Sequence, residues 1–455
     1  MHTKLGAIAV ALATGAATGV AQAQCGASGK DLLLTDVTAV TNYTPSPGGI
    51  DAASFGSLQT NVGSTALTSN IFSALHPVQA PNLYRLITSS GVSRFEQIGM
   101  GWAFHAGVPL NQAGFCTCEG GGGTSIGPGC SDPHTATSAG SAMNLGPRWQ
   151  VNAASGALTH PYTAPSGTNA GRLQFAVADV TPALNPGAAY FAELIVVHAE
   201  DAGDGNALNN ASVRPVLTSL AGDNPVISLS GATSPGVAAI QLWKDLVPGV
   251  VEAFVDVAGD GRFIVAARAV RLGGNQWDYE YAVFNLNSHR SAKSFTVQMP
   301  PGAAAVTPGF HDVSYHSGDG PGGATIVGTD WAFAQSADAA AWQTDDFAVD
   351  EAANALRWGT MYNFRLRGGV SPDLGEAVIG LFRPGSPEAV AAVVPVPARP
   401  SCLADHDGNG HVEVADIFAF LGDWFAGLPA GDALGDGGNG VPDIFAFLAA
   451  WFSGC

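Results

Sequence analysis

Twelve residues near the C-terminus, from Asp405 to Asp416, place oxygen-bearing side chains at positions 1, 3, 5, 9 and 12 and a glycine at position 6. Calcium takes about six to eight oxygen ligands in a tightly turned loop, and a glycine permits the turn. The pattern predicts a calcium (Ca²⁺) site, against the alternative of a solvated acidic turn. The predicted ligands are the side chains of Asp405, Asp407, Asn409, Glu413 and Asp416 and the main-chain carbonyl of His411.

A second loop of the same length, Asp432 to Asp443, matches the pattern less well. Asp432, Asp436 and Asp443 stand at positions 1, 5 and 12, and Gly437 stands at position 6. A leucine and a glycine occupy positions 3 and 9, where side-chain oxygens are needed. This loop is therefore expected to bind calcium weakly or not at all.

Each loop precedes a copy of the same apolar segment. Residues 416–425 read DIFAFLGDWF and residues 443–452 read DIFAFLAAWF, so eight of ten positions are identical at an offset of 27. The repeat indicates a tandem duplication, and its apolar spacing predicts one short amphipathic helix per copy. The last 55 residues contain eight Asp or Glu and no Lys or Arg. Such a concentration of carboxylates is unfavourable unless a cation neutralises it.

This duplicated loop-and-helix unit resembles a dockerin. The repeated segment, Cys402 and the terminal Gly454-Cys455 are similar to the GC-type dockerin tails of secreted bacterial proteins. The resemblance covers residues 402–455, about one eighth of the chain. It implies a calcium-folded module that docks a secreted protein onto a cohesin-like or cell-surface partner. Val414-Ala415 and Val441-Pro442 depart from the Ser or Thr that cohesin-reading dockerins often carry there.

The N-terminus indicates export. Residues 1–23 combine Lys4, an apolar run and an Ala-Gln-Ala cleavage site, which predicts a secretory signal peptide cleaved before Gln24. The alternative, a membrane anchor, disagrees with the short run and the cleavage site. No later stretch approaches the ~18 apolar residues of a spanning helix. The mature chain is therefore expected to be secreted, extracellular or cell-surface associated, without a membrane span.

Disulfides are the expected state of cysteines in an exported chain. Cys402 and Cys455 bracket the tail and are expected to pair, closing a loop that could contribute ~4 kcal/mol. Cys116 and Cys118 are too close to pair with each other, so each is expected to join one of the two remaining cysteines, Cys25 and Cys130. The alternative is a metal site formed by Cys116, Cys118, Cys130 and His134.

The composition excludes some classes of partner. The 455 residues include 37 Asp or Glu against 18 Lys or Arg, giving a formal charge of −19. This charge argues against binding nucleic acid or anionic membranes, because both require basic patches. A hydrophobic content of 46% rules out a disordered chain and suffices for sizeable cores.

Before residue 410 the chain alternates apolar and polar residues, the period of half-buried strands. Trp277, Tyr279, Tyr281 and Val283, for example, share one face of a predicted strand. Gly259-Asp260-Gly261, between two apolar runs, predicts a hairpin. The predicted fold class is mainly β, with two β-sandwich-like domains followed by a small α-helical tail. The predicted segments are a signal peptide (1–23), a β-rich domain with a cysteine-containing loop (24–215), a β-sandwich-like domain (216–390), a Pro-rich linker (391–401) and the dockerin-like domain (402–455).

Recognisable catalytic motifs are missing from the β-rich body. Glu193, Asp278 and Glu280 lie on predicted strands, where a polar strand face is the favoured interpretation over paired catalytic carboxylates. Separate surface histidines are favoured over a copper or zinc centre for the set His76, His105, His134 and His160. Residues 200–206 interleave acidic residues with glycine, and a solvated turn is favoured over a further calcium loop.

Three functions follow from these observations. The favoured one is a secreted, non-catalytic β-rich protein associated with polysaccharide and anchored through its calcium-binding tail. Exposed aromatics such as Trp277 or Trp358 would stack on sugars. The first alternative is a polysaccharide hydrolase carried by the dockerin-like module. The second is a metal-dependent extracellular oxidoreductase using the His- and Cys-rich region.

Overall fold

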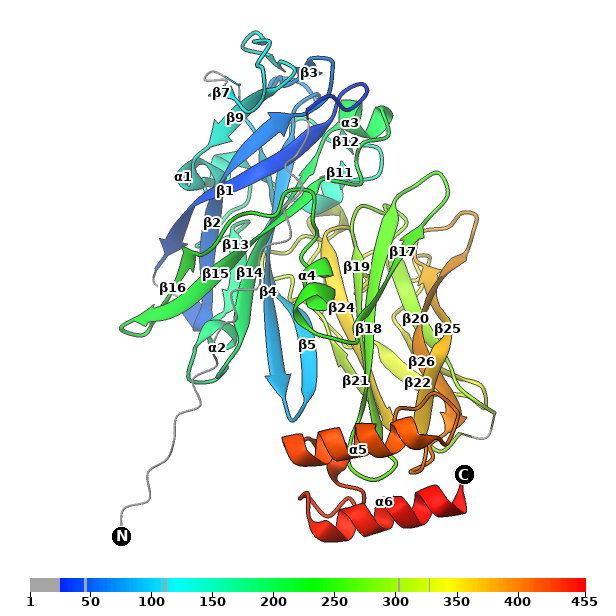
Figure 1. Cartoon of the computed structure of the whole chain (residues 1–455). Coiled ribbons are helices and arrows are strands. Elements are labelled where there is room, and N and C mark those ends of the chain that lie inside the picture. The colour runs from blue at the N-terminus through cyan, green and yellow to red at the C-terminus, as the bar shows by residue number, and fades with distance from the viewer. Residues whose placement is uncertain (1–24, 45–46, 108, 110–112, 302, 327) are drawn as a thin grey trace, which may run out of the picture.

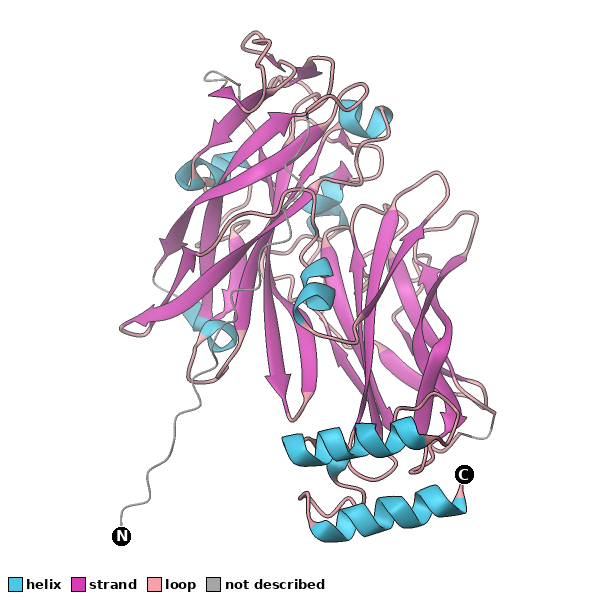
Figure 2. Ribbon diagram, in the orientation of Figure 1, coloured by secondary structure: helices cyan, strands magenta, loops and turns pink. Residues whose placement is uncertain are grey.

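The computed structural model describes residues 25–44, 47–107, 109, 113–301, 303–326 and 328–455. The fold is mainly β, with its two longest helices at the C-terminus (Figure 1; Figure 2). This confirms the predicted fold class. The predicted signal peptide lies outside the described residues. Among the helices that are described, none is long and apolar enough to cross a membrane.

The N-terminal unit is built on one sheet of twelve strands. In spatial order its main strands are β16 (Asn224–Leu229), β15 (Ala211–Ala221), β14 (Ala189–Val197), β4 (Val78–Ser89), β5 (Val92–Met100), β13 (Leu173–Ala176), β2 (Ile50–Asn61), β9 (Cys130–His134) and β7 (Ala113–Gly114). The others pair at its side: β1 (Leu32–Tyr43) with β2, β6 (Ala103–His105) with β4, and β10 (Leu145–Gly146) with β6. The sheet curls so that β1 packs against β14, β15 and β16 around Phe55, Leu83 and Leu194.

The second unit is a β-sandwich of two five-stranded sheets. One sheet contains β17 (Val251–Asp256), β18 (Arg262–Arg271), β19 (Trp277–Asn285), β24 (Thr360–Gly368) and β21 (Thr307–His311). The other contains β22 (Ala332–Gln335), β23 (Ala339–Gln343), β20 (Ala292–Gln298), β25 (Val370–Leu381) and β26 (Ala389–Pro400). Aromatic side chains from both sheets meet between them, with the Phe295 and Phe364 rings 4.6 Å apart. The predicted hairpin joins β17 to β18, and Gly259 in its turn has φ +71°.

Short elements connect the strands. Two ribbons pair β3 (Leu67–Thr68) with β8 (Ser125–Ile126) and β11 (Val151–Asn152) with β12 (Ala157–Leu158). The short α-helices are α1 (Ala136–Ala139), α2 (Val177–Val180), α3 (Ala199–Gly203) and α4 (Gln241–Leu246), and the 3-10 turns are Pro47–Gly49, Ala142–Asn144, Arg148–Gln150, Pro321–Gly323 and Pro429–Gly431.

Strand β19 is buried on both faces. Trp277, Tyr279, Tyr281 and Val283 point into the sandwich core, as the alternation predicted. The opposite face packs against the N-terminal unit instead of facing solvent: Phe284 lies in an apolar cluster shared by the two units. Asp278 and Glu280, which were expected on a polar face, are therefore buried. Each of them forms an ion pair with an arginine.

The two units share a core and a buried hydrogen-bond hub. Phe95 and Phe191 of the first unit lie in one cluster with Ile264 and Met361 of the second. The Arg148 guanidinium, 3% exposed, donates four bonds at this contact, of which the one to Gly359 crosses to the second unit. They run at 2.7–3.0 Å to the carbonyls of Gly101, Gly359 and Pro81 and to Asn82 Oδ1. The units are thus held as one body by apolar packing and buried polar contacts.

Two predicted boundaries are wrong. The boundary at 215/216 falls inside β15, which continues to Ala221 and then pairs with β16. The predicted linker 391–401 is mostly β26, the edge strand of the second sheet. Pro395 and Pro397 are two residues apart, so both lack an N–H on the same side of the strand. An edge strand tolerates this because one side makes no ladder bonds. Proline spacing that suits a linker also suits such an edge.

The tail forms two helices of equal length, α5 (Val414–Ala426) and α6 (Val441–Ser453). Phe420 and Phe447 occupy equivalent positions in the repeat and stack with ring centroids 4.2 Å apart. Figure 1 shows α5 between the end of the sandwich and α6. The predicted helical tail is confirmed, and it lies against the body.

The hub yields a prediction. Replacing Arg148→Met leaves its four acceptors without their buried donor, so the free energy of unfolding should fall by at least about 3 kcal/mol. Chemical denaturation of the full chain measures this. Arg262→Met is the control, because Arg262 pairs at 2.6 Å with Asp256 at the surface and should cost only about 0–1 kcal/mol. Equal effects of the two substitutions would contradict the hub.

Candidate metal centre

The first predicted calcium loop brings three carboxylates together. One oxygen from each of Asp405, Asp407 and Asp416 lies within 4.8 Å of the other two. Asp405 and Asp416 are buried and Asp407 is exposed. This is the one group of three or more His, Cys, Asp or Glu side chains in the described residues with ligand atoms this close. Oxygen-only donors of this kind suit a hard divalent cation.

Main-chain amides hold these carboxylates in place. Asp416 Oδ1 accepts bonds from the amides of His406 (2.7 Å) and Asp407 (3.2 Å), and its Oδ2 accepts from Glu413 (2.8 Å). Asp405 Oδ2 accepts from the Gly410 amide at 2.9 Å. Gly410 adopts φ +91°, a region that favours glycine. The turn therefore depends on the glycine at position 6, as predicted.

Asp405 has an oxygen with no partner. Its Oδ1 is buried and accepts no hydrogen bond from any described residue. Burial raises the pKa of Asp405, and the neighbouring Asp416 and Asp407 raise it further. A buried unpartnered carboxylate oxygen is costly unless a proton or a cation satisfies it. The donor set therefore fits a bound cation.

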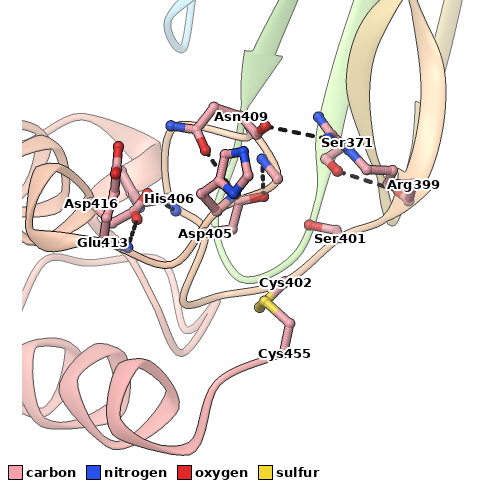
Figure 3. Close-up of a disulfide and its surroundings, with 12 residues drawn as sticks. Ser371, Arg399, Ser401, Cys402, Asp405, His406, Asn409, Glu413, Asp416 and Cys455 are labelled. Carbon is pink, nitrogen blue, oxygen red and sulfur yellow. Dashed lines mark hydrogen bonds between the residues drawn. A yellow bond between two sulfur atoms is a disulfide. The ribbon is translucent and has the colours of Figure 1, made fainter.

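The other predicted ligands surround this trio less closely. Asn409 Nδ2 donates to Asp407 Oδ2 at 2.9 Å, and Asn409 Oδ1 accepts from the His411 amide at 2.8 Å. Glu413 and His411 are exposed, and Glu413 directly precedes α5. Figure 3 shows the labelled loop residues near the Cys402–Cys455 disulfide.

The second loop folds similarly without gathering its carboxylates. Asp432 accepts bonds from the amides of Gly435, Asp436 and Gly437 at 2.7–3.1 Å. Asp443 accepts from the Gly440 amide, as Asp416 does from that of Glu413. Asp432, Asp436 and Asp443 do not form a three-ligand group among the described residues. The missing oxygen at position 3 accounts for this difference.

The body holds the first loop through two arginines that the sequence reasoning missed. Arg271 of β18 donates to the carbonyls of Asp405 (2.8 Å) and His406 (3.1 Å). Arg399 of β26 donates to the carbonyls of Gly408 (2.8 Å) and Asn409 (3.3 Å). The sequence did contain a signal for this contact, because the tail has no Lys or Arg. Any cationic side chain that holds the loop must therefore come from the body.

The cysteines pair as Cys25–Cys116, Cys118–Cys130 and Cys402–Cys455, which confirms the expected pairing. A metal site using cysteine ligands is therefore wrong, because disulfide sulfurs are not thiolates.

Three of the four candidate histidines are buried, and none of the four belongs to a group of three or more closely spaced metal-ligating side chains among the described residues. His76 Nε2 lies 2.8 Å from His105 Nδ1, and the His160 ring lies 6.0 Å from that of His76. His134 lies apart, with Nε2 3.4 Å from Asp132 Oδ2. Burial lowers the pKa of His105 to about 3. The expectation of separate surface histidines is wrong for His76, His105 and His134, whose side chains are interior.

Each candidate carboxylate of the body accepts hydrogen bonds or forms an ion pair with neighbouring side chains. Glu193 accepts bonds from Asn82, Tyr84 and the Ala239 amide. Asp278 pairs with Arg367 at 2.6 Å, and Glu280 pairs with Arg94 at 2.6 Å. Each therefore has a structural partner.

Two further sequence-based expectations also need correction. Trp277 and Trp358 are each 5% exposed, so the expected sugar-stacking role is wrong. Within residues 200–206, Asp201 is buried and bonds to Leu32 and Asn210, and Glu200 pairs with Lys30 at 2.5 Å. This segment begins in helix α3 and ends in an exposed turn at 204–205, so the expected solvated turn is correct only for its second half. Its acidic residues hold the N-terminal strand and the neighbouring loop.

No protein-family model matches the chain, and a search of curated proteins found no match.

The two position-6 glycines provide a matched test of the loop's attachment. Gly410 and Gly437 have φ of +91° and +97°, so alanine strains both loops alike. A Cβ on Gly410 would also overlap Arg399 Nη1, whereas Gly437 faces open space. Gly410→Ala should therefore destabilise the tail by about 1–3 kcal/mol more than Gly437→Ala, because it also displaces the Arg399 bonds. Hydrogen exchange of α5 in the full chain measures the difference, and equal protection would contradict this attachment.

Proposed function

We propose that this is a secreted β-rich protein, anchored by a calcium-folded, dockerin-like tail to a cohesin-like partner on a cell surface or scaffold. The observation that carries the proposal is the cluster of Asp405, Asp407 and Asp416 with the unpartnered Asp405 Oδ1. In this proposal these side chains hold Ca²⁺, with Asn409, Glu413 and the His411 carbonyl completing the set. The ion supplies positive charge that lets the loop close at the start of α5.

The exposed faces of the tail helices support docking. Phe418 and Phe425 on α5 are 71% and 78% exposed, and their repeat equivalents on α6, Phe445 and Phe452, are 67% and 78% exposed. One pair of equivalent phenylalanines is therefore buried and two pairs face outward. Exposed aromatics of this kind mark an interaction surface, because solvation of large apolar side chains is unfavourable.

The disulfides support an oxidising compartment outside the cell. Three bonds in one chain are rare where thiols are kept reduced. Together with the predicted signal peptide they favour secretion. Association with polysaccharide rests on the dockerin resemblance and is tested by assaying hydrolysis and binding of polysaccharides with the full chain.

Removing calcium should loosen the tail. In the full chain, EDTA should speed hydrogen exchange in α5 and the first loop, and added Ca²⁺ should restore protection. Asp416→Asn should abolish this response. Asp443→Asn is the matched control, because Asp443 makes the same amide contact at the start of α6 outside the cluster. Identical exchange in EDTA and Ca²⁺ would contradict a calcium-folded tail.

Docking should depend on the outward phenylalanines. Phe425→Asp combined with Phe452→Asp should weaken calcium-dependent binding to a cohesin-type domain by at least about thirtyfold, the loss expected for an interface hot spot. Biolayer interferometry with a panel of such domains measures this. Phe254→Asp, an exposed phenylalanine of the sandwich, should leave binding unchanged. A panel without any binder in Ca²⁺, or full binding by the double variant, would contradict docking through this face.

A further inference from the structure

Two buried histidines hold a surface loop of the N-terminal unit from inside. The loop runs from Asn70 to Leu75, and the Asn70 amide donates to the Leu75 carbonyl at 2.8 Å. At its base, His76 Nδ1 lies 2.7 Å from the Ser73 carbonyl, and His76 Nε2 lies 2.8 Å from His105 Nδ1. The two histidines are 0% and 2% exposed. The loop is therefore tied to the interior through a buried pair of rings.

The hydrogen-bond partners of these rings fix where their protons are. A carbonyl oxygen only accepts, so His76 Nδ1 must carry a proton and donate it to Ser73. A neutral imidazole has one N–H, so His76 Nε2 is then an acceptor and His105 Nδ1 must be the donor between the rings. When both rings are neutral, each is therefore the Nδ1–H tautomer, and His105 Nε2 carries a lone pair.

The free nitrogen of His105 has no partner for a proton. His105 Nε2 is buried and makes no hydrogen bond with any described residue. It lies against Gly146, where an added Cβ would overlap it. The Tyr162 ring stacks on the His105 ring with centroids 3.5 Å apart. An aromatic face favours a cation, but it offers no oxygen or nitrogen acceptor to Nε2. A proton on His105 Nε2 would thus be a buried and unsatisfied donor.

Neither ring can take up a second proton without placing one on this nitrogen. If His105 is protonated, Nε2 receives the proton directly. If His76 is protonated, both of its nitrogens donate, so His105 Nδ1 must accept and the proton of His105 must stand on Nε2. Burial, with the nearby His76 and His160, lowers the pKa of His105 to about 3. Burial also lowers the pKa of His76. The closed loop therefore resists protonation of the pair.

The other titratable groups around the pair do not stabilise a charged ring. His160 and Tyr162 face it from the segment after β12, and His198 faces it from the start of α3. No carboxylate of the described residues acts electrostatically on either ring of the pair. His160 Nε2 donates to the Ile71 carbonyl at 3.0 Å, and a protonated ring keeps this donor. Protonation of His160 therefore leaves its contact with the loop intact, unlike protonation of the pair.

We infer that His76 and His105 form an acid-sensitive lock on the loop 70–75, closed while both rings are neutral and opened when the pair takes up a proton. A histidine whose pKa is lowered by folding stabilises the closed loop above its ordinary pKa of about 6.5 and loses that contribution as the pH falls toward about 3. Uptake of one proton on opening raises the opening equilibrium about tenfold per pH unit in this window. The loop carries Phe72, which is 82% exposed, so the lock sets the pH at which this apolar tip is held in place. This inference is independent of the tail and of its calcium.

The tautomers test the arrangement of protons directly. Long-range ¹H–¹⁵N correlation spectra of the imidazoles in the full chain, recorded at about pH 7.5, should show both rings as Nδ1–H tautomers. His76→Gln and His105→Gln assign the signals. His105 Nε2 should stay mainly unprotonated down to about pH 5, well below the ordinary histidine pKa. An Nε2–H tautomer of His105 at neutral pH, or a mainly charged His105 ring at about pH 5, overturns the inference.

Hydrogen exchange of the full chain measures the lock itself. After correction for the intrinsic rate, opening at the Asn70 amide should rise about tenfold per pH unit between about pH 6 and pH 4, relative to amides of β19. His105→Gln should reduce this rise to less than twofold, because a glutamine amide can donate to neutral His76 or accept from protonated His76. His160→Gln is the control and should keep the rise, since its amide can still donate to Ile71. A rise that is absent from the natural chain, or unchanged in a folded His105→Gln variant, contradicts the lock. Melting temperatures at neutral pH establish which variants are folded, and the tautomers and the natural chain decide the matter if His105→Gln does not fold.

Discussion

Mutual repulsion among the carboxylates of one small loop is the constraint on which the tail depends. At a separation within 4.8 Å, two ionised groups such as Asp405 and Asp416 repel by about 3–4 kcal/mol at the effective dielectric typical of a protein surface. That is similar to the ~4 kcal/mol that the Cys402–Cys455 bond could contribute by closing the segment. The repulsion between the carboxylates would therefore largely cancel the stabilisation that the disulfide provides. A bound cation attracts the carboxylates, so the electrostatic contribution then becomes favourable. The closed loop places Asp416 at the start of α5, and α5 positions Phe420 against Phe447.

The tail is attached to the body through side chains of the sandwich strands. Arg271 and Arg399 donate to loop carbonyls and bring positive charge to a segment that has no Lys or Arg. The Trp277 ring lies against Gly408 of the same loop, and the Gly274 amide donates to the Asp432 carbonyl of the second loop at 2.7 Å. With the tail held in this way, its four outward phenylalanines remain exposed. The tail helices are therefore coupled to the body through the two loops.

Local patterns in the sequence were sufficient to predict the strands, the hairpin at 259–261, the tail helices and the first loop. These features depend on neighbours in the chain: alternation, glycine at positive φ, and the spacing of oxygen-bearing residues. The burial of Asp278 and Glu280 could not be predicted, because their partners Arg367 and Arg94 come from distant strands. Likewise, the pocket between the two units is lined by residues from 100 to 383. The edge strand β26 was missed because proline spacing fits both a linker and an edge.

The most direct test of the central claim is a crystal structure of the full chain grown with calcium, with diffraction data collected for the anomalous signal of the ion. The account predicts an anomalous peak bound by side-chain oxygens of Asp405, Asp407 and Asp416, and none at the second loop or a weaker one. Carboxylates that point apart around ordinary solvent, with no peak between them, would contradict it.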